Sequence, residues 1–167
     1  MRKTISHAVS VKSTDELRGI GSDIDTVMVE SDDKNGKHII RWFVRHTNMN
    51  GDVGGLVSTL ANVSENTYID AKSLVMDFAE ISNSAVINSL IGESASIEES
   101  AITDSDVGAG SIVRSTILIN DKIGAGSNVV LSVKIPPERS RVVDNSNVVW
   151  LMRGRRKRGK PGQGRPS

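Results

Sequence analysis

Three stretches of the chain repeat one seven-residue phrase: Ile91-Gly92-Glu93-Ser94-Ala95-Ser96-Ile97, Val107-Gly108-Ala109-Gly110-Ser111-Ile112-Val113 and Ile123-Gly124-Ala125-Gly126-Ser127-Asn128-Val129. The copies begin at positions 91, 107 and 123, so the step from one to the next is constant. A repeat this short cannot bury its own apolar side, so successive copies must stack on one another. The spacing therefore predicts a solenoid.

Other positions keep the same spacing. Val86, Ile102 and Leu118 form an aliphatic column, Ser84, Ser100 and Thr116 a hydroxyl column, and Asn88, Asp104 and Asn120 a polar column. Upstream, four aliphatic residues are spaced by six: Val63, Ile69, Val75 and Ile81. Small residues lie between them. Three sides of six residues make a coil of eighteen residues, and the later coils are shortened to sixteen residues.

The pattern fits short strands better than a helix. Each side of a coil pairs with the same side of the next coil at about 4.7–4.9 Å, so aliphatic side chains stack inside. Glycines at the corners, among them Gly92 and Gly108, are expected to adopt backbone angles that are closed to other residues, and Asn and Asp tolerate similar angles. Segments of six residues without a period of 3.6 do not form an amphipathic helix. We expect an all-β chain with a parallel β-helix over residues 59–131.

The repeat resembles the hexapeptide-repeat family, and residues 91–129 are similar to the C-terminal β-helix of sugar nucleotidyltransferases. A second phrase, Gly51-Asp52-Val53-Gly54-Gly55-Leu56-Val57 followed by Asn62-Val63-Ser64, is similar to the opening of the β-helix in a group of enterobacterial and phage-encoded hexapeptide proteins. The resemblance implies a left-handed, triangular, single-stranded β-helix, a threefold homo-oligomer, and a bacterial or phage origin.

A β-hairpin is predicted within residues 1–58. Asn35-Gly36 suits a tight turn, and it lies between the strand-like segments 26–30 and 38–45. Ile40, Trp42 and Val44 share one face of the second segment. The hairpin either caps the open edges of the first coil or forms a ligand-binding module. Residues 132–151, where Pro136 and Pro137 interrupt the coils, are expected to form a second cap.

The end of the chain is strongly basic. Residues 1–150 hold 14 Lys and Arg against 20 Asp and Glu, a net charge of −6, whereas residues 151–167 hold seven basic residues and no acidic one. A segment this polar and rich in Gly and Pro cannot form a core, so residues 152–167 are expected to be a disordered tail. It is a candidate docking segment for nucleic acid or an acidic protein partner through Arg153, Arg155, Arg156, Lys157, Arg158, Lys160 and Arg165. A purely solubilising role is an equal alternative.

Catalytic and metal-binding residues are not predicted. Hexapeptide acyltransferases use a histidine at a coil edge as general base, and related zinc enzymes use three histidines. Here His7, His38 and His46 all precede the repeats, and the chain has no cysteine. Gly51–Gly55 is not followed by the Lys-Ser or Lys-Thr of a phosphate loop. The acidic residues of the coils are scattered, as on a solvated surface. We therefore expect no catalytic residue, cofactor or metal.

Outward-facing positions become apolar in the last coils. Ile112, Val130 and either Leu118 or Ile119 replace Ser96, Glu98 or Thr103 of earlier coils, and we take Ile119 as the outward residue. An aliphatic stripe on a flat face favours self-association, unless the inward register is shifted by one residue. The sequence thus predicts a non-enzymatic structural or interaction solenoid that self-associates. A nucleic-acid accessory protein and, below it, an acyltransferase using His38 or His46 are the alternatives.

The sequence also bears on location. No segment approaches the length of a membrane span, and no apolar run follows Arg2 and Lys3 as it would in a signal peptide. We expect a cytoplasmic protein of a bacterial cell or a phage-infected host.

Overall fold

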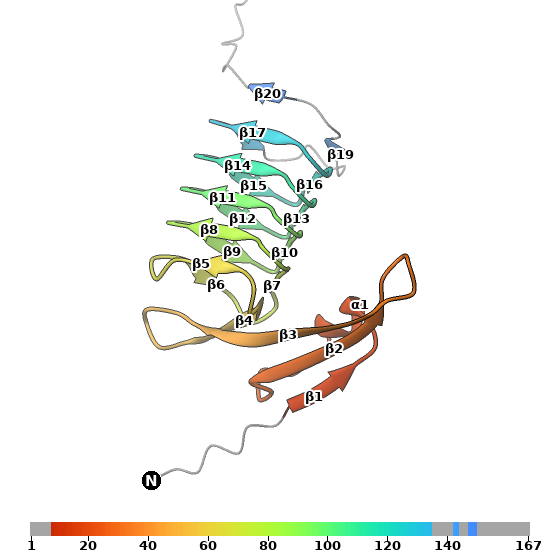
Figure 1. The fold of residues 1–167 in the computed structure, drawn as a ribbon. Coiled ribbons are helices and arrows are strands. Elements are labelled where there is room, and N and C mark those ends of the chain that lie inside the picture. Colours follow the sequence, from red (N-terminus) through yellow and green to blue (C-terminus); the bar gives the residue numbers. More distant parts are fainter. Residues whose placement is uncertain (1–7, 135–141, 144–146, 150–167) are drawn as a thin grey trace, which may run out of the picture.

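The computed structural model describes residues 8–134, 142–143 and 147–149, which form an all-β parallel solenoid (Figure 1). Its coils have three sides, and each side belongs to a sheet that runs along the solenoid axis. The predicted fold class is confirmed. The left-handed sense of the coils stays a prediction.

Sheet A contains nine strands in the order β1 (Ala8–Val11), β2 (Thr26–Asp32), β3 (His38–Thr47), β4 (Val53–Ser58), β7 (Leu74–Val75), β10 (Leu90–Ile91), β13 (Asp106–Val107), β16 (Lys122–Ile123) and β19 (Val142–Val143). Sheet B contains β20 (Asn147–Val149), β17 (Asn128–Val130), β14 (Ile112–Arg114), β11 (Ser96–Glu98), β8 (Glu80–Ser82) and β5 (Asn62–Val63). Sheet C contains β18 (Val133–Lys134), β15 (Ile117–Ile119), β12 (Ala101–Thr103), β9 (Ala85–Ile87) and β6 (Tyr68–Ile69). A single-turn helix, α1 (Thr14–Leu17), follows β1.

The strand register reproduces the periods of the sequence. Ile91 pairs with Val107, and Ile97 with Val113, so each residue meets its equivalent in the next copy of the repeated phrase. In the first coil the step is longer by two, from Val57 to Val75. The coil strands from β6 to β17 each direct one aliphatic side chain into the bore. With Val57 of β4 and two alanines next to strands, these residues make one continuous buried cluster: Val57, Ile69, Val75, Ala79, Ile81, Val86, Ile91, Ala95, Ile97, Ile102, Val107, Val113, Leu118, Ile123 and Val129.

From Phe78 to Leu131, each described corner of a coil places one residue in the left-handed region of backbone space. The residues with positive φ form three columns: Phe78, Ser94, Gly110 and Gly126 between sheets A and B; Asn83, Glu99, Ser115 and Leu131 between B and C; and Asn88, Asp104 and Asn120 between C and A. This conformation costs residues with a Cβ about 1–2 kcal/mol, and glycine avoids that cost.

Gly92 and Gly108 serve a different purpose from the one expected at a corner, because their φ angles are not positive. A Cβ on Gly92 would lie 2.7 Å from the main-chain N of Ala109 in the next coil. A Cβ on Gly108 would lie 2.5 Å from the main-chain N of Ala125. These glycines are needed for the close approach of successive coils.

Two columns of hydroxyl side chains connect the coils. Ser100 Oγ donates to the Glu98 carbonyl at 2.7 Å and accepts from the Thr116 N–H at 3.1 Å. Ser89 repeats this arrangement at the next corner, with the Ile87 carbonyl at 2.7 Å and the Ser105 N–H at 3.0 Å. Because these groups are buried, each hydroxyl satisfies a main-chain N–H that would otherwise lack a partner.

The predicted hairpin is confirmed. Strands β2 and β3 are antiparallel, Asp32 pairs with His38, and Gly36 in the connecting turn has a φ of +75°. Strand β4 is antiparallel to β3 and parallel to β7, so the hairpin sheet continues without a break into one side of the solenoid. Figure 1 shows β3 lying beneath the first coil. The outer face of this sheet is covered by α1 and the loop after it, with a second buried cluster of Val11, Leu17, Val27, Val29, Phe43, Leu56 and Leu74.

Two polar side chains join the hairpin to the first coil. The Arg45 guanidinium donates to the carbonyls of Ile20, Gly21, Ile24, Gly54 and Ala71, and its burial lowers its pKa from the usual value. The side-chain amide of Asn48 accepts from the Ile69 N–H at 2.8 Å and donates to the Ile69 carbonyl at 2.9 Å, as a neighbouring strand would. The hairpin thus pairs with the edge of β4 in sheet A and, through Asn48, with the edge of β6 in sheet C. Within the described residues no strand lies below β5 in sheet B.

After the two prolines the chain returns to the solenoid. β19 pairs with β16 and β20 pairs with β17, so residues expected to fold over the open end instead extend two sheets by one strand each. Pro136 and Pro137 and the predicted tail over 152–167 lie outside the described residues.

Ser94 and Gly110 provide a test of backbone strain at the corners. Ser94 has a φ of +57° and occupies the column in which Gly110 and Gly126 also lie. Ser94→Gly should raise the free energy of unfolding by about 0.5–1 kcal/mol, because glycine removes the left-handed strain at the expense of some chain entropy. Gly110→Ala, where a Cβ meets no atom within 4 Å, should lower it by about 1 kcal/mol. Chemical denaturation measures the free energy of unfolding of both variants. A change of the same sign and size in both would contradict the assignment of backbone strain to this corner.

Candidate functional site

The outer face of sheet C is the main apolar surface of the coils. Because successive residues of a strand point to opposite faces, the neighbours of the inward residues Val86, Ile102 and Leu118 point outward. The large apolar side chains exposed in this way are Tyr68 (39 % exposed), Ile87 (39 %), Ile117 (42 %) and Val133 (53 %). Ile119 is half-buried on the same face. These side chains are not needed to fill the bore.

A shallow groove of about 670 Å³ runs along this face beside the corner between sheets B and C. Its floor is low because Ala85 and Ala101 lie between the larger Tyr68 and Ile117 in successive strands. The rim is polar and ordered by contacts between coils: Asn66 Nδ2 donates to Asn83 Oδ1 at 3.1 Å, and Ser115 Oγ to Glu99 Oε2 at 3.2 Å. An apolar floor with a polar rim is the usual composition of a protein interface.

The predicted self-association residues all point outward. Ile112 and Val130 lie on sheet B, next to the inward residues Val113 and Val129, and are half-buried. Ile119 lies on sheet C beside the buried Leu118. The predicted register is therefore right, and the choice between Leu118 and Ile119 is settled in favour of Ile119. The prediction omitted Tyr68, Ile87, Ile117 and Val133, which could have been found as the other neighbours of the inward columns.

Sheet B is less apolar than sheet C on its outer face. The Arg114 guanidinium pairs with the Glu98 carboxylate at 3.1 Å, beside Ile112. In the lower coils the outward positions are Asn62 and Glu80. The aliphatic part of this face is limited to the upper coils.

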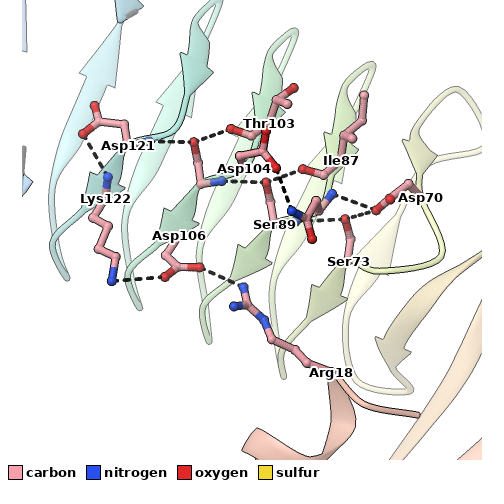
Figure 2. Close-up of polar contacts among 12 residues, drawn as sticks. Arg18, Asp70, Ser73, Ile87, Ser89, Thr103, Asp104, Asp106, Asp121 and Lys122 are labelled. Atoms are coloured by element: carbon pink, nitrogen blue, oxygen red, sulfur yellow. Dashed lines mark hydrogen bonds and ion pairs between the residues drawn. The ribbon is translucent and has the colours of Figure 1, made fainter. Parts of the chain in front are cut away.

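The corner between sheets C and A is polar (Figure 2). Asp70 Oδ1 accepts from the Ser73 hydroxyl and from the Asn88 N–H, and Asn88 Nδ2 donates to Asp104 Oδ1 at 2.6 Å. Asp106 is paired with Arg18 at 2.8 Å, which fastens the segment after α1 to the coils. These carboxylates support the fold. In the part of the chain that the structure describes, no group of three His, Cys, Asp or Glu residues is arranged to hold a metal ion.

The histidines named in the acyltransferase alternative, and the basic segment predicted for docking, lie as follows. His38 Nδ1 lies 3.4 Å from Asp32 Oδ1, and His46 Nε2 lies 3.3 Å from the Thr67 carbonyl oxygen. They occupy opposite ends of β3, roughly 26 Å apart at about 3.3 Å per residue. His7 lies outside the described residues. So do the seven basic residues of the tail: Arg153, Arg155, Arg156, Lys157, Arg158, Lys160 and Arg165.

No protein-family model matches the chain, and no curated protein sequence does. Among the described residues there is no helix with the length and apolar character needed to cross a membrane.

Ile117 and Leu118 are neighbours in β15 that test whether the sheet C face is separate from the core. Ile117→Ser should change the free energy of unfolding of the isolated chain by less than about 0.5 kcal/mol, because the side chain lies on the surface and outside the buried cluster of the bore. Leu118 is fully buried in the bore, and Leu118→Ala should cost about 2–5 kcal/mol. Urea denaturation at low protein concentration gives both values. A large loss from Ile117→Ser would mean that the face belongs to the core.

Proposed function

We propose that the chain is a structural or interaction solenoid of the hexapeptide-repeat type, and that it self-associates through the outer face of sheet C. The observation that carries the proposal is the exposed apolar groove between Tyr68 and Ile117. Contiguous apolar surface that the fold itself does not require is typical of an interaction site. Tyr68 offers an aromatic anchor of the kind that dominates interface energies.

The size of the face indicates how it would be used. Sheet C has five described strands of two or three residues, so it measures about 19 Å along the axis and about 10 Å across. A stable interface buries about 800 Å² on each partner, which is more than this face provides alone. Ile112 and Val130 on sheet B supply the neighbouring half of the surface. A subunit that uses two sides of its triangular coil is suited to a threefold ring.

Assembly through sheet C can be tested with a charge at its centre. Wild-type chain should sediment as a homo-oligomer, with a trimer as the expected species, and Ile117→Lys should sediment as a monomer because a charge would be buried in the contact. The matched control is Val53→Lys, which changes a valine of β4 (50 % exposed, against 42 % for Ile117) outside the groove and should leave assembly intact. Sedimentation velocity over a range of concentrations provides the measurement.

Two results would contradict the proposal. One is a wild-type chain that stays monomeric at the highest concentration. The other is an Ile117→Lys variant that assembles as the wild type does. Circular dichroism of each variant shows whether the fold is retained, so loss of assembly is separated from unfolding.

A further inference from the structure

Phe78 is an exposed aromatic residue in a strained backbone conformation. Its φ is +59°, and the residue is 57 % exposed. The equivalent corner positions of later coils hold Ser94, Gly110 and Gly126, and glycine adopts this conformation without strain. Phe78 belongs to neither of the two buried clusters. A strained residue that the fold does not need is a reason to look for a binding role.

Other exposed apolar residues surround the same corner. The Thr59 N–H donates to the Trp42 carbonyl at 2.9 Å, and Arg41 pairs with the carboxylate of Asp77 at 3.0 Å. These contacts bring the main chain of β3 to the corners of the first two coils, with Arg41 on one face of the strand and Ile40 and Trp42 on the other. The apolar side chains exposed around them are Ile40 (51 %), Trp42 (42 %), Leu60 (55 %) and Phe78, which we name the corner patch. It contains two of the five aromatic residues of the chain.

The rim of the corner patch is acidic. Glu30 pairs across the hairpin with Ile40, Glu80 follows Phe78 on sheet B, and Glu93 lies at the same corner one coil further on. All three are exposed, and within the described residues none of the three forms an ion pair. The corner patch therefore suits an apolar segment that is followed or flanked by positive charge.

The chain itself contains such a segment. Residues 150–158 read Trp150-Leu151-Met152-Arg153-Gly154-Arg155-Arg156-Lys157-Arg158, three large apolar residues followed by five cations and one glycine. We propose that this segment of a second copy docks on the corner patch. The apolar residues would contact Trp42, Leu60 and Phe78, and the arginines would lie against the acidic rim.

Geometry selects a second copy over the same chain. Trp150 directly follows β20, which is four strand spacings from β8 in sheet B. At about 4.8 Å per spacing, this places β20 about 19 Å from the coil of Phe78. Consecutive Cα atoms are only about 3.8 Å apart, so Trp150 cannot reach the corner patch of its own molecule.

The proposed contact is head to tail, and it is independent of the groove on sheet C. Different surfaces of the two copies meet, so the contact either closes into a ring, of which two copies exchanging tails is the smallest, or repeats from copy to copy. A chain with both contacts would link its oligomers to one another.

The tail contact can be tested by disulfide cross-linking. The chain has no cysteine, so two full-length variants, Leu60→Cys and Leu151→Cys, each carry a single thiol. Mixed in equal amounts under mild oxidation, they should form a disulfide heterodimer at a yield at least ten times that of Val53→Cys mixed with Leu151→Cys. Raised salt should lower the yield, because screening weakens the attraction between the tail and the rim. Ile117→Lys should leave it unchanged, which distinguishes this contact from assembly through sheet C.

A further variant separates binding from folding. Phe78→Gly removes the left-handed strain and should raise the free energy of unfolding, yet it should reduce cross-linking of Leu60→Cys at least ten-fold. The proposal is overturned if the yield stays at the level of the Val53→Cys control, or if Phe78→Gly does not lower it. It is also overturned if the tail binds duplex DNA while no cross-link forms, which would assign the basic residues to nucleic acid.

Discussion

Main-chain pairing between equivalent positions of successive coils is the constraint on which this structure depends. Every strand must meet its equivalent at about 4.8 Å, so every column must hold a residue that tolerates its own kind directly above and below. Ile91 and Val107 satisfy this by stacking in the bore. Ser84 and Ser100 satisfy it with a hydrogen bond between coils, in which the Ser100 N–H donates to Ser84 Oγ. Gly92 satisfies it by having no side chain to obstruct the approach. The triangular coil is thus a single local solution repeated along an axis.

Repetition also determined what could be predicted from the sequence. Inward residues such as Ile97 and Ile102 could be identified because each column offers several independent examples, and Asn35-Gly36 marked the hairpin because its turn chemistry is local. The contacts of Arg45 with Ile20 and of Asn48 with Ile69 occur once, join segments that are distant in the sequence, and leave no periodic signal. The role of Gly92 was misjudged for a related reason, since glycine is equally suitable for positive φ and for close approach, and only the backbone distinguishes the two.

The candidate site was predicted in part. Ile112, Ile119 and Val130 were found by comparing a polar position with its apolar successors in later coils. This comparison overlooks Tyr68, whose column continues with alanines, and it overlooks the groove that those alanines create. Phe78 was beyond sequence reasoning, because its interest lies in a backbone angle combined with exposure. A groove that forms over small side chains, and a residue with a strained backbone angle, can be found only in the three-dimensional structure.

Strand β4 belongs both to the antiparallel hairpin sheet and to the first coil, and this shared strand bears on the order in which the chain folds. The hairpin can form from short-range contacts, which are the quickest to establish. Once it exists, β4 presents a finished edge on which β7 can add, and each new coil then offers the next edge. If the strands add in this order, the N-terminal module acts as a template that sets the register of sheet A for the later coils. Synthesis delivers the coils in the order in which this growth requires them.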